Sequence, residues 1–206
     1  NQLSLKLEDL VSNLSMDTEN AHDALADCEF LIHLMKIIAQ KLPNFYKEIL
    51  ETTSKDGYFK KLNSNKVHFN CYFIPRTKTT KAYPFTPLIT DYSLSKYIPI
   101  FDLSYDPDDF IGLSYTELEL LINSKKKSPF KRLAINKTQP TICLDTLTKD
   151  NIIIEDQELL KDRAKTIHTN NTLIERVTDI YNNLEYVNLK KINIEEQIYT
   201  EGFPSS

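Results

Sequence analysis

The stretch from Leu25 to Leu42 constrains the fold most strongly, because its apolar residues repeat with the period of an α-helix. Apolar side chains recur at intervals of three and four positions, at Leu25, Cys28, Leu31, Ile32, Met35, Ile38, Ala39 and Leu42. This spacing predicts a helix with one buried face. Asp23 is a good N-cap residue for it, and Pro43 prevents the helix from continuing.

A histidine and an aspartate lie on either side of the predicted helix start. His22 is in the loop before the cap, and Asp27 is in the first turn or so. A bare H-x-x-x-x-D spacing is common in proteins. By itself it therefore fits solvated polar residues at a helix start as well as it fits a catalytic pair.

The surrounding residues extend the pattern beyond this pair. The leucines at 5, 7 and 10 precede the octet Asn-Ala-His-Asp-Ala-Leu-Ala-Asp at 20–27. This combination resembles the third motif of the DnaQ-like (DEDDh) 3′→5′ exonucleases. Further segments resemble the bacterial exodeoxyribonuclease I family within that group, namely Gln40-Lys41-Leu42-Pro43, Ile135-Asn136-Lys137 with Pro140, Asp145-Thr146-Leu147, and Gln197 to Phe203.

The resemblance implies a single-strand-specific 3′→5′ exodeoxyribonuclease that releases 5′-mononucleotides in DNA repair and recombination. In that family two Mg²⁺ ions assist the attack of water on the phosphodiester bond. Asp27 matches a metal ligand of the motif. His22 matches the general base, and a group that titrates near neutral pH suits that role. Asp23 matches no metal-ligand position and is expected to be a cap.

The remaining metal ligands of the family are missing from their expected places. The family needs an Asp-x-Glu pair on its first strand and another aspartate before the third motif. Asp17-Thr18-Glu19 has the right residue types but lies directly before His22, in a turn-like segment. We therefore expect the chain to be the C-terminal part of a longer exonuclease and to be inactive alone.

Composition narrows the class of protein. The chain has 206 residues, 41% of them hydrophobic, and a formal net charge of −4. The acidic balance argues against nucleic-acid binding by bulk charge. Cys28, Cys71 and Cys143 have neither a zinc-site spacing nor a disulfide pattern, so we expect reduced, buried thiols. No apolar run reaches membrane-spanning length, and we expect a cytoplasmic protein. We also expect it to be a monomer.

The sequence after residue 65 predicts short strands and then helices. Residues 66–74 alternate between apolar and polar, which indicates a half-buried strand with His68 on its outer face. Further strands are predicted at 98–103, 131–136 and 141–147, with a proline-rich connection over 75–99. A capping box at Ser114–Glu117 begins a helix. Two helices follow, from about 155 to 167 and from about 171, and 186–206 is expected to be a polar linker.

These elements predict an α+β protein. We expect residues 1–45 to be the C-terminal remnant of an RNase H-like exonuclease domain. An SH3-like β domain with accessory helices would occupy 46–188, with a loop around Asp56-Gly57 near its start. Residues 189–206 would lead toward a C-terminal helical domain. Pattern alone indicates a small antiparallel barrel or sheet, and the SH3-like assignment comes from the family resemblance.

A basic cluster at 125–132 is the candidate DNA contact. Its charged residues are Lys125, Lys126, Lys127, Lys131 and Arg132, with Phe130 among them. Such a cluster can bind a phosphate backbone and stack a base, or it can be a solvated loop. The family resemblance also implies two partners, a single-stranded DNA 3′ end and the acidic tail of the single-stranded DNA-binding protein. The helix around 161–168 falls in the region of that tail site.

Two other functions stay open at this point. The chain can belong to another DEDDh branch, such as a proofreading or RNA-trimming exonuclease. The long β-rich segment after the motif argues against that branch, because those chains usually end soon after this helix. The other alternative is a non-catalytic DNA- or protein-binding module in which His22 and Asp27 are vestigial.

Overall fold

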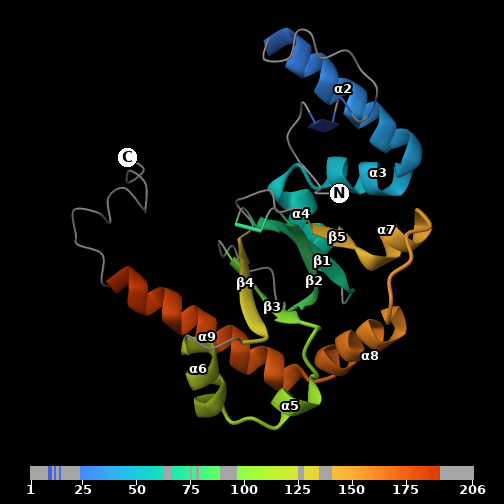
Figure 1. The fold of residues 1–206 in the computed structure, drawn as a ribbon. Coiled ribbons are helices and arrows are strands. Elements are labelled where there is room, and N and C mark those ends of the chain that lie inside the picture. The colour runs from blue at the N-terminus through green and yellow to red at the C-terminus, as the bar shows by residue number, and fades with distance from the viewer. Residues whose placement is uncertain are drawn as a thin grey trace.

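The computed structural model describes residues 9–10, 12, 14, 24–62, 66–74, 76–77, 79–88, 97–124, 128–134 and 141–190, except the side chains of 73 and 185–190. From Ala24 onward, α2 (Ala24–Lys41), α3 (Pro43–Glu51) and α4 (Lys55–Leu62) follow one another. Helices α2 and α3 lie at one end of the molecule, and α5, α6, α8 and α9 lie at the other (Figure 1).

A five-stranded antiparallel sheet forms the centre of the molecule. Its strands are β1 (His68–Ile74), β2 (Thr79–Pro87), β3 (Tyr97–Asp102), β4 (Phe130–Ala134) and β5 (Thr141–Cys143). Their order is β4-β3-β2-β1-β5, and β1 pairs with both β2 and β5. The structure thus confirms the α+β class and the predicted antiparallel sheet. The RNase H-like and SH3-like assignments stay predictions.

The remaining helices lie between the strands or after them. They are α5 (Asp108–Ile111), α6 (Tyr115–Asn123), α7 (Leu144–Lys149), α8 (Gln157–His168) and α9 (Asn171–Lys190). Ser114 and Glu117 form the predicted capping box of α6. Helix α9 continues past residue 186, where the sequence predicts a linker. Within the described ranges, no helix has both the length and the apolarity needed to cross a membrane.

Apolar side chains cover the sheet on both faces. On one face, Phe101 and Phe130 join buried residues of α6, α8 and α9, such as Leu118 and Val177, in the larger core. On the other face, α4 packs over the sheet with Tyr58, Phe59 and Leu62 against Phe85, Ile98, Ile100 and Leu133. The sheet is therefore a middle layer that is covered on both faces over part of its strands, whereas Thr79 to Ala82 of β2 are exposed.

The second covering layer explains why the prediction for His68 is wrong. Strand alternation places His68 opposite the apolar residues of β1, and a half-buried strand would expose it. In the structure its side chain is fully buried, and its ring lies 5.5 Å from that of Phe85. Burial, together with Lys61 and Lys66 nearby, lowers the pKa of His68 to about 3, so the imidazole is neutral at physiological pH.

Three further segments differ from their predictions. Residues 79–87 of the expected proline-rich connection form β2, which pairs with β1 from Thr79 to Phe85. Pro84 lacks a backbone N–H, but its carbonyl accepts a hydrogen bond from the backbone N–H of Leu103. Residues 144–147 begin helix α7 instead of extending a strand. Cys28 is exposed, whereas Cys71 is half-buried and Cys143 is buried; all three are free.

The expected loop at Asp56-Gly57 lies inside helix α4. A Cβ atom at position 57 would lie only 1.9 Å from the carbonyl oxygen of Glu51, the last residue of α3. Gly57 is therefore a close-packing residue between two helices, and its role is tertiary rather than that of a turn.

Replacing Gly57 by alanine should destabilise the chain. The added methyl group forces the α3–α4 junction apart, and overpacking of this kind costs about 1–3 kcal/mol. The matched control is Gly112→Ala, where a Cβ meets nothing within 4 Å and the backbone is right-handed helical. Urea unfolding followed by circular dichroism measures both variants. Equal stability of the two would show that the junction accommodates the methyl group.

Candidate functional site

Asp27 lies in the first turn of α2 and is partly exposed. A carboxylate in this place is open to solvent and can donate one oxygen ligand to a divalent cation. His22, Asp17 and Glu19 lie outside the described residues. In the part of the chain that the structure describes, no three His, Cys, Asp or Glu side chains come together in a metal-binding group. Asp27 alone does not make a metal centre.

The apolar stripe of α2 is largely uncovered by the described residues. Leu25, Leu31 and Ile32 are 67%, 50% and 55% exposed, and Phe30 is the residue that α2 buries. The helix is confirmed, but the expectation that this stripe forms a buried face is wrong for this structure. Among the described elements, none covers the stripe formed by Leu25, Leu31 and Ile32.

Helix α3 attaches this helix to the rest of the protein. Only Leu42 separates α2 from α3, and Leu42 provides no side-chain cap for α3. Asp150, just after α7, caps it instead. Its carboxylate accepts hydrogen bonds from the backbone N–H of Asn44 and Phe45, at 3.1 and 2.7 Å, and from the Asn44 side chain at 2.7 Å.

The charge state of Asp150 favours this cap. Burial raises the pKa of the Asp150 carboxyl, but the hydrogen bonds from Asn44 and Phe45 lower it more and hold it below its usual range. The first-turn N–H groups of a helix otherwise lack partners, and a negative charge there also suits the helix dipole. The start of α3 is thus fixed by a residue more than 100 positions later in the chain.

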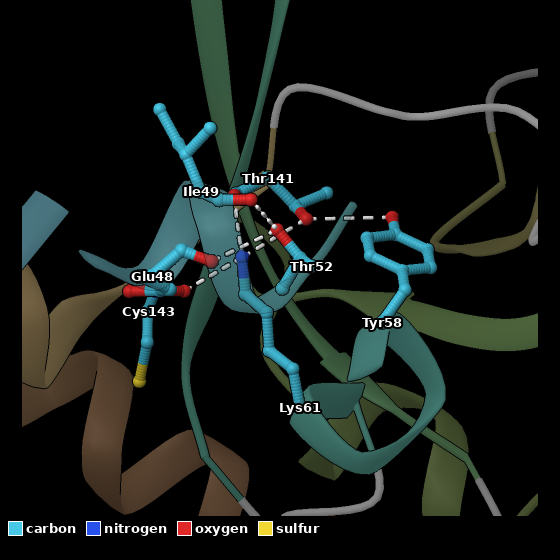
Figure 2. A network of polar contacts seen from close by, with 7 residues as sticks. All are labelled: Glu48, Ile49, Thr52, Tyr58, Lys61, Thr141 and Cys143. Atoms are coloured by element: carbon cyan, nitrogen blue, oxygen red, sulfur yellow. Dashed lines mark hydrogen bonds and ion pairs between the residues drawn. The ribbon is translucent and has the colours of Figure 1, made fainter. Parts of the chain in front are cut away.

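A buried ion pair fixes the middle of α3 (Figure 2). The ammonium group of Lys61 in α4 lies 2.6 Å from a carboxylate oxygen of Glu48, and their side chains are 8% and 11% exposed. The same oxygen of Glu48 accepts a hydrogen bond of 3.0 Å from the backbone N–H of Cys143. Lys61 also donates a hydrogen bond to the carbonyl oxygen of Thr141 in β5. The side-chain hydroxyl of Thr141 in turn donates to the hydroxyl of Tyr58 in α4. One pair of charges therefore joins α3, α4 and β5.

A cavity of about 620 Å³ opens beside this network, between α3, α4, β5 and α7. Five lysines contribute to its wall, Lys47, Lys60, Lys61, Lys66 and Lys149. Lys66 pairs with Asp145 at 2.7 Å, and the exposed Lys47 lies 3.8 Å from Glu51. Among the described residues, Lys60 and Lys149 form no ion pair of this kind. The cavity is thus suited to an anionic ligand.

Cys143 at the cavity wall is not an activated nucleophile. Burial raises the pKa of its thiol, more than the backbone hydrogen bond from Asp145 lowers it. A protonated thiol is a poor nucleophile and a poor metal ligand. Cys143 therefore gives this cavity no reactive thiolate.

The structure separates the residues of the predicted basic cluster. Lys125, Lys126 and Lys127 lie outside the described residues. Lys131 and Arg132 are neighbours on β4 and so belong to opposite faces of the sheet. The Lys131 ammonium lies over the ring of Tyr83, whereas Arg132 lies over Tyr97 and Tyr181. Phe130 is 3% exposed within the core, so the expectation that it stacks a base is wrong.

The charged residues of α8 are largely engaged within the protein. Arg163 donates to the carbonyl oxygen of Leu103, and His168 lies 2.7 Å from the Thr86 hydroxyl. Lys161 pairs with Glu158 on the same helix. Two of the basic side chains at 161–168, those of Arg163 and His168, are thus engaged within the protein.

Comparisons with known proteins agree with the predicted resemblance. The chain is 25% identical to exodeoxyribonuclease I of Haemophilus influenzae over 227 aligned positions, which cover 98% of the chain. The chain resembles exodeoxyribonuclease I over nearly its whole length. This confirms the resemblance inferred from the octet. No protein-family model matches.

Solved structures of exonuclease I share the fold. A zinc-bound complex of the Escherichia coli enzyme with single-stranded DNA superimposes with a TM-score of 0.58 at 20% identity and covers 87% of the chain. A complex of exonuclease I with SSB-Ct gives 0.61 at 20% identity and covers 98%. The chain spans 46% of the Haemophilus exodeoxyribonuclease I and 41% and 44% of the two solved chains.

Replacing Lys61 by methionine should destabilise the chain strongly. The variant leaves the buried Glu48 carboxylate without its cation, and breaking a buried pair in this way costs about 3–5 kcal/mol. The free energy of unfolding, measured in urea, should fall by that order. The double variant Glu48→Gln with Lys61→Met should recover part of the loss, because no charge then stays buried.

The matched control is Lys47→Met on the same helical unit. Lys47 pairs with Glu51 at the surface, with side-chain exposures of 77% and 64%. Exposed pairs of this kind contribute at most about 1 kcal/mol. If Lys61→Met unfolds at the same urea concentration as Lys47→Met, the buried pair does not hold α3 in place.

Proposed function

We propose that this chain is part of a single-strand-specific 3′→5′ exodeoxyribonuclease that releases 5′-mononucleotides. The observation that carries the proposal is the similarity to exodeoxyribonuclease I along 98% of the chain. The sequence of the octet 20–27 supports it, and the last four residues of the octet begin α2. The proposed domain arrangement has exonuclease residues at 1–45, an SH3-like accessory domain at 46–188 and a connection at 189–206. The parent enzyme would act in DNA repair and recombination.

In this proposal two residues of the chain take part in the hydrolysis. His22 would accept a proton from the attacking water, and Asp27 would hold one of two Mg²⁺ ions. When bound, the ions would supply activation of the water and stabilisation of the leaving 3′ oxygen. Mg²⁺ is often held by one or two carboxylates with water and substrate phosphate. The other carboxylate ligands would come from the preceding part of the parent enzyme.

Substituting His22 in the full-length parent should slow hydrolysis sharply. Losing a general base typically costs about 100-fold or more in turnover. Asp27→Asn should lower turnover and raise the Mg²⁺ concentration needed. The assay is the shortening of a 5′-labelled single-stranded DNA oligonucleotide with Mg²⁺. His33→Ala and Glu29→Gln are the matched controls, because both residues are exposed on the same helix.

Several outcomes would contradict the proposal. Unchanged turnover in His22→Ala would remove this residue from the mechanism, and a preference for RNA 3′ ends would favour another DEDDh branch. The chain alone should leave the oligonucleotide intact. Shortening by the chain alone, abolished by Asp27→Ala, would make Asp17 and Glu19 candidate metal ligands. A parent protein that binds DNA but never shortens it would be a non-catalytic module.

The lysine-lined cavity supports a second role, which is docking of an acidic peptide. We propose that it receives the acidic tail of a single-stranded DNA-binding protein. Its wall carries five lysines, and one structural neighbour is a complex of exonuclease I with SSB-Ct. An acidic tail complements such a wall, and the buried Glu48–Lys61 pair makes part of the wall rigid.

Replacing Lys60 and Lys149 together by alanine should weaken binding of an acidic peptide about tenfold or more, because hydrogen bonds to charged groups contribute about 1.5–3 kcal/mol. Fluorescence anisotropy with a labelled peptide measures this affinity. Lys36→Ala, an exposed lysine of α2, should leave binding unchanged. An equal loss in both variants would indicate attraction by overall charge, and no loss in the double variant would place the peptide elsewhere.

A further inference from the structure

The lysine-lined cavity also carries negative charges in its own wall. Three carboxylates, those of Glu48, Glu51 and Asp145, line it together with the five lysines. Burial holds the pKa of His68, which lines it too, at about 3, so this imidazole adds no charge. Five lysines and three carboxylates leave the lining with a formal charge of +2. An acidic ligand therefore competes with internal carboxylates for the same lysines.

The three ion pairs of the wall differ in how open they are to a ligand. The pair that joins α3 to α4 is buried, and a ligand cannot separate it without disturbing the packing of both helices (Figure 2). Glu51 lies 3.8 Å from Lys47, and both side chains are mostly exposed. Asp145 lies only 2.7 Å from Lys66, with side chains 48% and 53% exposed. This third pair is thus both closely made and within reach of solvent.

The backbone fixes Asp145 opposite Lys66. The N–H of Leu144, at the start of α7, donates a hydrogen bond of 2.9 Å to the carbonyl oxygen of Val67. Asp145 follows Leu144, and Lys66 precedes Val67. The hydroxyl of Thr86 donates a further hydrogen bond to the carbonyl oxygen of Lys66. Because these bonds hold both backbones, the two side chains can part and meet again without any change in the wall.

Both members of this pair are stabilised in their charged forms. The hydrogen bond between them raises the pKa of Lys66 and lowers the pKa of the Asp145 carboxyl. The charges of Lys149 and Lys161 lower the pKa of Asp145 further, against the effect of burial. Asp145 is therefore ionised at physiological pH. It occupies Lys66 with a carboxylate, the same group that an acidic peptide presents.

We propose that Asp145 is an internal competitor that limits the affinity of the lysine-lined cavity for acidic ligands. To reach Lys66, a ligand carboxylate must replace the Asp145 carboxylate, which then faces the ligand as a like charge. A ligand with several carboxylates offsets this cost through contacts with Lys60 and Lys149. A small anion that reaches only Lys66 has no such contacts. The proposal rests on the proposed docking role and assigns to Asp145 control of how tightly the docked peptide is held.

The test is a double-variant cycle on this chain, read by fluorescence anisotropy with a labelled oligo-aspartate peptide. Asp145→Asn should tighten binding about threefold to fivefold, the upper range of what an exposed ion pair contributes. In a Lys66→Met background the same substitution should tighten binding less, because no pair then has to open. Glu51→Gln is the charge-matched control. It removes one negative charge from the same wall, where the contact with lysine is already loose.

Three results would overturn the proposal. The first is unchanged affinity in Asp145→Asn. The second is equal tightening in Asp145→Asn and Glu51→Gln, which would indicate overall charge alone. The third is an equal gain with and without Lys66, which would show that Asp145 repels the ligand without occupying Lys66. Circular dichroism and urea unfolding check that each variant is folded.

Failure of this proposal differs from failure of the docking role. Weaker binding in the Lys60→Ala, Lys149→Ala double variant, with no tightening in Asp145→Asn, keeps the docking role and removes the competitor. Tightening in Asp145→Asn, with no effect of the double variant, keeps the competitor and removes Lys60 and Lys149 as the docking wall. The absence of peptide binding in every variant removes both.

Discussion

The buried pair of Glu48 and Lys61 is the interaction on which the arrangement of the N-terminal helices depends. Charges so little exposed lose most of their hydration, and their attraction offsets that loss only with good geometry and further hydrogen bonds. The backbone N–H of Cys143 and the carbonyl of Thr141 supply those bonds. Because these partners belong to β5, the pair forms properly only when α3, α4 and the sheet are assembled together.

This dependence reaches the candidate catalytic helix. Helix α2 joins α3 through Leu42 alone, and α3 is held at its start by Asp150 and at its middle by Lys61. A site carried on helices is positioned more precisely than one carried on loops. The orientation of Asp27 relative to the sheet is therefore set by residues that belong to other elements. The same contacts shape the wall of the lysine-lined cavity.

Local sequence signals predicted the elements that local physics determines. The period of α2, the capping box of α6 and the alternation of β1 each depend on neighbours within a few residues. His68, β2 and Gly57 were misjudged because the deciding partner is distant: α4 covers one face of the sheet, and the end of α3 meets Gly57. A signal for Lys61 did exist. Lys61 lies three residues after Tyr58, so the two side chains share one face of helix α4, the face that is buried.

The same distinction governs the candidate binding residues. Lys131 and Arg132 are adjacent in sequence and were grouped as one cluster, yet a strand sends them to opposite faces of the sheet. Lys66 and Asp145 are far apart in sequence, and the pairing of β1 with β5 brings them together. Charge density along the chain is thus a poor guide to a binding surface in a β domain. The register of the strands decides which charges act together.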